Sequence, residues 1–244
     1  MKRAVLLLAA FPIALANASF KPGQFFTSGP ADQKRIALTF DDGPGPNTEK
    51  FLELLDRYHV KATFFLQGTQ LKLRPQLAKK TVEQGHEIGS HTWQHLNYKA
   101  HLKQLKKKFS ADPHGEEKAL AAAKKDLVED MKKTQRLIEE TTGVKVEICR
   151  MPHGIDGGWV HEAAKEAGVA LINWTYGADW TSPPPDPVES LKRSYVRALK
   201  PGTIYLIHDG WAKSEKSLAV AEAVIKAAQA NGYQMVTVGE LVGH

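Results

Sequence analysis

Cysteine is nearly absent from this chain of 244 residues, which holds only Cys149 and therefore cannot form a disulfide bond within itself. Exported domains often rely on such bonds, and that source of stability is excluded here. Cys149 follows an apolar stretch, and we interpret it as a buried strand residue. The fold must therefore be stabilised by a hydrophobic core, for which 42% of the residues are suited, with a metal ion as a further contribution.

Long apolar runs are also missing beyond the amino terminus, so no later segment is expected to cross a membrane. The first residues have the order of a secretory signal peptide: Lys2 and Arg3 are basic, an apolar stretch runs to Leu15, and a small residue stands at Ala18. We expect a signal peptide over 1–18 and an exported protein that is periplasmic, secreted or held in the cell envelope. An uncleaved membrane anchor is the alternative.

The charge balance is only mildly basic. The net charge is +6, and two of these charges belong to Lys2 and Arg3, which leaves +4 after the predicted cleavage. Lysines concentrate between 99 and 125, a segment we interpret as an insertion with a solvated face; an anionic polymer or phospholipid surface is the alternative partner. The segment lacks the interleaved aromatic residues of single-strand binders, so no nucleic-acid partner is expected.

Strand and helix signals alternate along the rest of the chain. Strands are predicted over 36–40, 62–66, 87–90, 144–149, 169–174, 203–207 and 234–238, and helices over 48–58, 74–83, 120–140, 159–167, 187–199 and 217–230. This alternation predicts an α/β fold with a parallel sheet in one domain over 35–244, preceded by an irregular segment over 19–34. Seven strands favour a closed or nearly closed barrel, with a doubly wound sheet as the alternative.

Polar residues gather where the predicted strands end. In chain order they are Asp41 and Asp42, His91 and His95, Arg150, Asp179, and then His208 with Asp209. The carboxyl ends of parallel strands meet at one edge of a sheet or barrel, which is where such folds carry their functional groups. We therefore expect these residues to converge at one rim.

Two of these groups suggest a metal site. Asp41 and Asp42 are adjacent carboxylates at the end of an apolar run, and such a pair is costly to bury unless a cation neutralises it. A cluster capping the next helix is the alternative interpretation. His91 and His95 are four residues apart, so on a helical turn they would share one face. Two imidazoles and a carboxylate form a zinc-type ligand set that leaves positions for water and substrate.

Five short motifs carry a resemblance to a known family. They are Thr39-Phe40-Asp41-Asp42-Gly43-Pro44, His91-Thr92-Trp93-Gln94-His95, Arg150-Met151-Pro152-His153-Gly154, Asp179-Trp180 and Leu206-Ile207-His208. In this order they resemble the polysaccharide deacetylases, the carbohydrate esterase family 4 enzymes with a NodB-homology domain. The resemblance spans nearly all of 35–244 and implies a distorted (β/α)7 barrel.

The resemblance implies a role for each matching residue. Asp42, His91 and His95 would bind a divalent metal, with Zn²⁺ expected and Co²⁺ or another divalent ion as the alternative. Asp41 would be the general base that takes a proton from the metal-bound water. Arg150 would lie against Asp41 and keep it ionised and oriented.

Other roles concern the leaving group and the substrate. His208 would be the general acid that protonates the leaving amine, with Asp179 holding its imidazole charged. The backbone N–H of His153 would help to stabilise the oxyanion. The residues expected to contact the substrate are Pro152, Trp180 and Leu206, the last two lining a pocket for the acetyl methyl.

The chain departs from the family pattern in two ways. His153 stands where the family usually has an aromatic residue, so its side chain is a candidate for contact with substrate, a further metal ligand or an acid. The connection after His95 is longer than usual, and we expect the insertion to shape the cleft.

The predicted function is a metal-dependent hydrolase that removes N-acetyl groups from N-acetylhexosamine-containing glycans, such as chitin-type oligosaccharides or peptidoglycan. An O-acetyl esterase on xylan-type polymers is the neighbouring alternative. A catalytically silent carbohydrate-binding protein is the alternative from another class, although binding alone does not require both Asp41 and His208. A structural domain that carries a metal is a more distant interpretation.

Overall fold

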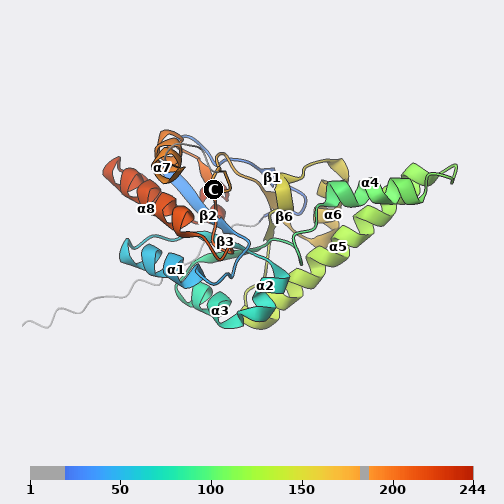
Figure 1. Cartoon of the computed structure of the whole chain (residues 1–244), viewed down its shortest axis with the longest axis horizontal. Coiled ribbons are helices and arrows are strands. Elements are labelled where there is room, and N and C mark those ends of the chain that lie inside the picture. The colour runs from blue at the N-terminus through green and yellow to red at the C-terminus, as the bar shows by residue number, and fades with distance from the viewer. Residues whose placement is uncertain (1–19, 182–186, 244) are drawn as a thin grey trace, which may run out of the picture.

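The computed structural model describes residues 20–181 and 187–243 (Figure 1). The signal peptide predicted over 1–18 lies outside the described residues, as does most of the proline-rich stretch before residue 187. In the described part of the chain no helix is both long enough and apolar enough to cross a bilayer.

One parallel sheet organises the molecule, with the strand order β1-β6-β5-β4-β3-β2-β7 and with β8 pairing β2. The strands are β1 Phe25–Phe26, β2 Arg35–Asp41, β3 Thr63–Leu66, β4 Glu87–Ser90, β5 Ile148–Cys149, β6 Ala170–Ile172, β7 Ile204–His208 and β8 Gln234–Val236. All seven predicted strands are present, and the prediction of an α/β fold with a parallel sheet is confirmed. The short β1 is additional, because it lies in the segment that we expected to be irregular.

The sheet curves until its two sides meet, which gives the distorted barrel predicted for the family. The chain after β6 reaches β7: the Thr175 N–H donates to the carbonyl of Ile204 at 2.9 Å, and the Leu206 N–H donates to the carbonyl of Tyr176 at 2.8 Å. Tyr176 also forms a parallel bridge with Tyr205. These bonds satisfy backbone groups that an open sheet would leave unpaired.

Strand β2 lies at the centre of this arrangement and pairs with three strands. Its residues from Ile36 to Phe40 are fully buried, as expected for an apolar strand covered on both faces. Its last residue, Asp41, pairs with Phe65 of β3 on one side and with His208 of β7 on the other. The register therefore carries Asp41 and His208 to the same rim.

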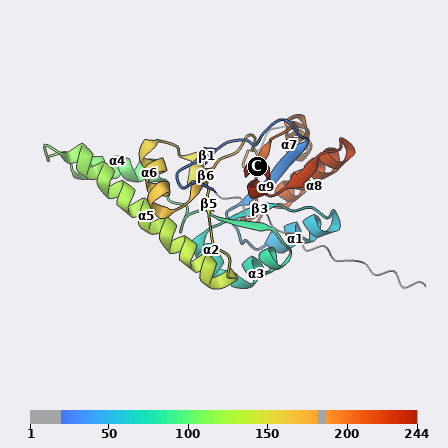
Figure 2. The same ribbon diagram turned by 180° about the vertical axis from the view of Figure 1, so that it is seen from behind.

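Nine α-helices are described, and most of them cover the outside of the sheet (Figures 1 and 2). They are α1 Thr48–Arg57, α2 Gly68–Leu73, α3 Pro75–Glu83, α4 Tyr98–Lys108, α5 Gly115–Thr142, α6 Gly158–Ala167, α7 Pro187–Arg197, α8 Glu215–Ala230 and α9 Val238–Val242, and a 3₁₀ turn spans Pro152–Gly154. The largest core cluster joins apolar residues of α1, α7 and α8 to β2 and β3.

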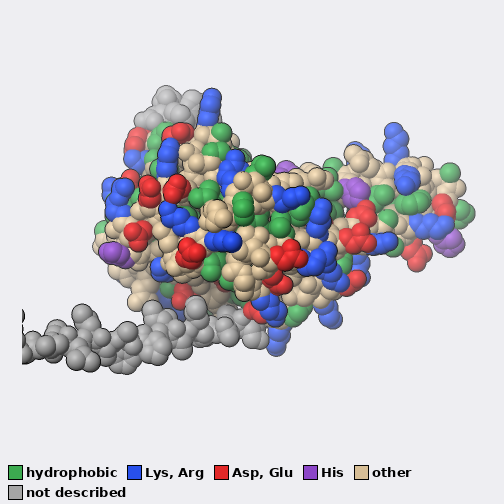
Figure 3. All heavy atoms as spheres, turned by 90° about the horizontal axis from the view of Figure 1, so that it is seen from below, with side chains coloured by type: hydrophobic (Ala, Val, Ile, Leu, Met, Phe, Trp, Pro, Cys, Tyr) green, Lys and Arg blue, Asp and Glu red, His purple; other side chains and the backbone are tan. Residues whose placement is uncertain are grey.

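The insertion predicted over 99–125 is a helical hairpin made of α4 and the first part of α5. It extends well beyond the rest of the molecule in both views (Figures 1 and 2). Residues 109–114 form the turn between the two helices, and we did not predict α4 itself. On the face seen in Figure 3, lysine and arginine side chains are interspersed with acidic ones, along the hairpin as elsewhere.

Two strand boundaries differ from the predictions for identifiable reasons. The strand predicted over 144–149 is reduced to β5 because side chains of α5 bind the preceding backbone: Gln135 donates to the Val146 carbonyl, and Glu139 accepts from the Val146 N–H. The last strand stops at Val236 because Thr237 and Glu240 form a reciprocal capping box that begins α9.

Candidate active site

The adjacent carboxylates Asp41 and Asp42 lie at the rim where β2 ends, as predicted. Asp42 has a left-handed backbone conformation, with a φ of 69°, so the chain turns sharply at this point. The loop after β7 packs directly against this turn: a Cβ atom at Gly210 would lie 2.1 Å from the Asp42 carbonyl oxygen. Only glycine allows that approach, and the two loops are therefore held together at the site.

Asp42, His91 and His95 converge on one point and form a cluster suited to a metal ion. The Oδ1 atom of Asp42 lies 3.5 Å from Nε2 of His91 and 3.6 Å from Nε2 of His95. Ligands about 2.0–2.2 Å from a tetrahedral zinc ion lie roughly 3.4 Å from one another, which these two distances match. Oδ1 is also buried and accepts no hydrogen bond from any described residue. An unpartnered buried carboxylate oxygen between two imidazoles fits a cation.

The two imidazoles are oriented by their surroundings. Nδ1 of His91 lies 2.8 Å from the Arg150 carbonyl oxygen, so Nδ1 carries the proton and the lone pair of Nε2 is directed to the cluster. The pKa of His95 is lowered, first by burial and then by the neighbouring His91. A neutral imidazole is the form that ligates a metal.

Arg150 is fully buried and binds Asp41 directly. Its NH1 group donates to Oδ1 of Asp41 at 2.7 Å and to the hydroxyl of Thr39 at 2.6 Å. Its other nitrogens donate to the carbonyl groups of Ile172 and Asn173, both at 3.0 Å. The guanidinium is thus anchored on several sides, and it fixes one oxygen of Asp41 while the other is directed to the cluster, 3.7 Å from Nε2 of His91.

His208 and Asp179 form a second pair of ionisable groups, and His208 lines the same pocket as Asp41. Nδ1 of His208 lies 2.7 Å from Oδ1 of Asp179, and Oδ2 of Asp179 accepts from the His208 N–H at 2.8 Å and from the Ser217 hydroxyl at 2.7 Å. Burial alone would lower the pKa of His208, but the hydrogen bond to Asp179 and its charge outweigh burial and raise it. The arrangement favours the protonated form of His208, which lines the pocket.

These groups line one pocket of about 400 Å³. Its walls are formed by Asp41, Asp42, His91, His95, Met151, His153, Trp174, Trp180, Leu206, His208 and Trp211. Leu206 is buried, whereas 47% of the Trp180 surface is exposed at the mouth. The predicted contact residue Pro152 is buried and is not among the lining residues. No residue of the insertion 99–125 lines this pocket.

His153 lies at the edge of the pocket with an exposed side chain. Its ring centroid is 4.7 Å from that of His95, and its backbone has a φ of 60°, which is uncommon outside glycine. The strained turn belongs to the 3₁₀ segment Pro152–Gly154 and brings the residue next to the metal cluster.

Asp209 forms a buried carboxyl behind the turn. Burial raises its pKa to about 7. Its Oδ2 accepts a hydrogen bond from the hydroxyl of Thr48, the first residue of α1. A Cβ atom at Gly43 would lie 2.6 Å from that oxygen, so glycine is needed where the turn passes the carboxyl. Asp209 therefore supports the turn from behind and is not a wall of the pocket.

The sequence did not point to Asp130 of α5, which holds the loop that carries His95. Its Oδ1 accepts from the Trp93 N–H at 2.7 Å, and its Oδ2 accepts from the Tyr98 hydroxyl at 2.9 Å. Trp93 lies between the two histidine ligands and Tyr98 follows them, so one carboxylate fixes the loop at two points. A charged residue among many on a long helix gives no signal of this role in the sequence.

Replacing Asp130 by Ala should lower the free energy of unfolding by about 1–3 kcal/mol, because the Trp93 N–H and the Tyr98 hydroxyl lose their acceptor. Urea denaturation followed by circular dichroism measures this loss. Asp126→Ala on the same helix is the matched control: among the described residues this exposed carboxylate forms an ion pair with His101 alone, so its loss should stay within about 0.5 kcal/mol. Equal losses in the two variants would contradict the assigned role of Asp130.

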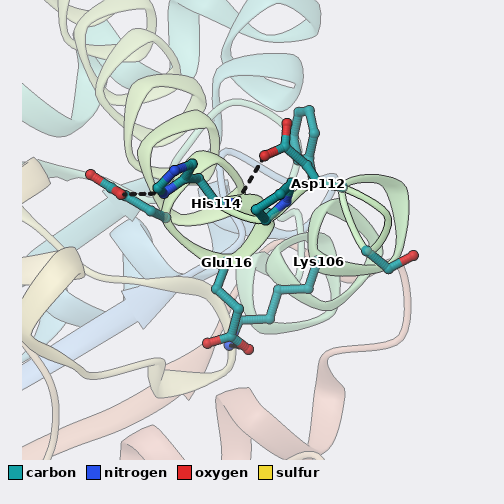
Figure 4. A pocket seen from close by; sticks show the side chains of 9 residues that line it. Lys106, Asp112, His114 and Glu116 are labelled. Carbon is teal, nitrogen blue, oxygen red and sulfur yellow. Dashed lines mark hydrogen bonds and ion pairs between the residues drawn. The ribbon is translucent and has the colours of Figure 1, made fainter.

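The hairpin tip has a separate open hollow, lined in part by Lys106, Asp112, His114 and Glu116 (Figure 4). Lys106 and Glu116 form an ion pair of 3.1 Å across it. The hollow contains none of the strand-end residues described above, and its Asp112 already forms an ion pair with Lys118. The chemistry is therefore assigned to the pocket at the barrel rim.

Comparison with known proteins agrees with this geometry. Residues 28–172 match the family model described as polysaccharide deacetylase. The chain is 33% identical to a peptidoglycan-N-acetylglucosamine deacetylase of Bacillus cereus, over 87% of this chain and 90% of that protein. It is 30% identical to a chitooligosaccharide deacetylase of Sinorhizobium fredii, over 72% of each chain.

A solved structure has the same fold. It is a pseudoenzyme of carbohydrate esterase family 4 from Bacillus anthracis, with a TM-score of 0.73 and 25% identity over 90% of this chain and 69% of that chain. Because a pseudoenzyme shares this fold, the fold does not by itself establish activity. The activity must therefore be argued from the residues of the site.

Proposed function

This chain belongs to the polysaccharide deacetylase family, and from that premise we propose that it removes N-acetyl groups from a glycan that contains N-acetylhexosamine. The observation that carries the proposal is the presence of two separately anchored acid–base groups in the same pocket as one metal-type cluster. Asp41 is bound by Arg150, and His208 is bound by Asp179. A protein that only binds carbohydrate has no need for both.

The proposed cofactor is a divalent cation, with Zn²⁺ favoured, held by Asp42, His91 and His95. The fit of the site is supported by the unpartnered Oδ1 atom of Asp42 and by its distances to the two Nε2 atoms. Two nitrogen ligands and one oxygen ligand suit zinc better than magnesium or calcium, which prefer oxygen. When bound there, the ion supplies a Lewis acid that polarises the acetyl carbonyl and makes water more acidic.

The protein residues then account for the proton transfers of amide hydrolysis. Water attacks the acetyl carbon, and Asp41 accepts the proton that the water loses, while Arg150 keeps the Asp41 carboxylate in place. As the carbon–nitrogen bond breaks, Nε2–H of His208 donates a proton to the leaving nitrogen. The products are acetate and the amine of a hexosamine unit. One anchored carboxylate and one anchored imidazolium thus divide the roles of base and acid.

The pocket walls suggest how the acetyl group is recognised. Leu206 and Trp180 offer an apolar surface for the acetyl methyl, and Trp180 is exposed enough to contact the sugar as well. The backbone N–H of His153 is proposed as a donor to the developing oxyanion. The names of the relatives favour a substrate of the peptidoglycan or chitooligosaccharide class.

The proposed location is outside the cytoplasm, in the periplasm, the envelope or the surrounding medium. The basic and apolar order of residues 1–18 supports export, and a peptidoglycan substrate would be met there. An acetylated glycan is the partner that this proposal requires.

Acetate release tests the proposed function. The purified protein is incubated with N-acetylated chitooligosaccharides, with peptidoglycan and with acetylated xylan, before and after treatment with a chelator and again after Zn²⁺ is added back. We expect acetate to appear together with free amine, to fall to background after chelation and to return with Zn²⁺. Release from xylan alone would support the O-acetyl esterase, and binding without acetate would support the silent carbohydrate-binding protein.

A further inference from the structure

The indole of Trp211 joins the two halves of the candidate active site. Trp211 follows β7 in the loop that packs against the Asp41-Asp42 turn. Its Nε1–H donates a hydrogen bond of 2.9 Å to Oδ2 of Asp42. Its ring stacks on the imidazole of His208 with a centroid distance of 4.3 Å and an interplanar angle of 13°. One side chain therefore contacts both a candidate metal ligand and the candidate acid.

The hydrogen bond acts on the oxygen of Asp42 that does not face the imidazoles. Oδ1 is the unpartnered oxygen near His91 and His95, whereas Oδ2 is occupied by the indole. A carboxylate bound in this way cannot rotate without breaking the hydrogen bond. Removing a group that holds a metal ligand in this way typically lowers the metal affinity by about 10–100-fold.

The loop that carries Trp211 is itself anchored. The side-chain amide of Asn47 donates to the carbonyl of Ala212 at 2.9 Å and to that of Trp211 at 3.4 Å. Asn47 is buried and lies just before α1. The close approach of Gly45 to Gly210, where an added Cβ would lie 2.5 Å away, locks the same two loops together. The indole is therefore held in a fixed position.

We infer that Trp211 is a positioning residue that presents Asp42 to the metal through a single oxygen, and that it is not a platform for a sugar ring. One face of the indole is covered by His208 and its N–H is used by Asp42, so the ring is held by two contacts within the site itself. This inference rests on the metal site proposed above. It adds a residue outside the five motifs, contributed by the loop after β7.

The test compares two matched substitutions, Trp211→Phe and Trp180→Phe. Both replace an indole at the same pocket, and Trp180 also contacts His208, edge-on with a centroid distance of 5.6 Å. Only Trp211 donates a hydrogen bond to Asp42. Zn²⁺ affinity is measured without substrate, by competition with a chromogenic chelator. We expect the affinity to fall by about tenfold or more in Trp211→Phe and to stay unchanged in Trp180→Phe.

Further measurements keep the result interpretable. Asn47→Ala leaves the indole intact but frees its loop, so a smaller loss of Zn²⁺ affinity in the same direction is expected even if Trp211→Phe folds poorly. If Trp211→Phe binds Zn²⁺ like the wild type and instead raises KM for longer oligosaccharides, the residue is a sugar platform and the inference is wrong. If the wild type itself binds no Zn²⁺, the metal site of the proposed function fails first.

Discussion

Replacing Asp41 by Asn should lower kcat by about 10²–10⁴-fold while the metal stays bound. The substitution keeps the shape of the side chain and an oxygen that can accept from Arg150, but it removes the basic group that takes the proton from water. A positioned base typically contributes a factor of this size. Acetate release gives kcat, and elemental analysis of the purified variant gives its metal content.

Asp42→Asn is the matched control because it makes the same chemical change one residue away. Oδ1 of Asp42 lies between the two imidazoles, so this variant should lose metal affinity and recover part of its rate when excess Zn²⁺ is added. Asp41→Asn leaves the buried Arg150 without its counterion, so the folded fraction must be measured first. If the Asp41→Asn variant lacked metal and the Asp42→Asn variant kept its full metal content, the roles of base and metal ligand would be reversed.

Replacing His208 by Ala should lower kcat by a similar factor of about 10²–10⁴ and should abolish the decline of the rate at alkaline pH. The acid works only while it is protonated. The hydrogen bond from His208 to Asp179 and the charge of Asp179 outweigh burial and raise its pKa, so the wild type should stay active to a higher pH than an ordinary imidazole would allow. Above the pKa of His208 in the folded enzyme, the rate should fall.

Asp179→Asn supplies the matching pH experiment. Without the charge of Asp179, burial should lower the pKa of His208, and the alkaline decline should move to lower pH while the metal content stays the same. The pH dependence of kcat/KM in the two variants and the wild type measures both effects. An active His208→Ala enzyme would exclude His208 as the acid and make His153 the first candidate, since it lies beside His95.

The part of the site that lies at strand ends could be predicted from the sequence. Asp41, His91 and Arg150 each directly follow a predicted strand, and parallel strands bring such positions together whatever connects them. The strand register, in which Asp41 of β2 pairs with His208 of β7, agrees with this rule. The local sequence pattern is sufficient to predict these site residues because the fold repeats the same geometry at the end of each strand.

The residues that support the site could not be found in this way. Asp130 and Trp211 act through hydrogen bonds between segments that are distant in the sequence, and nothing in their neighbours indicates those partners. The helix α4 was missed although Tyr98, Leu102 and Leu105 recur at helical spacing, because its many lysines led us to interpret the segment as a solvated insertion. The start of α9 did have a local signal, the Thr237–Glu240 capping box, which the β-branched residues around it obscured.

The central position of β2 affects the order in which the parts of the barrel can form during folding. β2 pairs with β3 soon after it in the chain, but Ala37 must also meet Ile204 and Arg35 must meet Gln234. Contacts so distant in sequence form slowly, because a large loop must close before they stabilise the fold. During synthesis, the three proposed metal ligands are therefore made long before the strand that completes their barrel. Until the last quarter of the chain has been made, the apolar edge of β2 stays unpaired and open to aggregation.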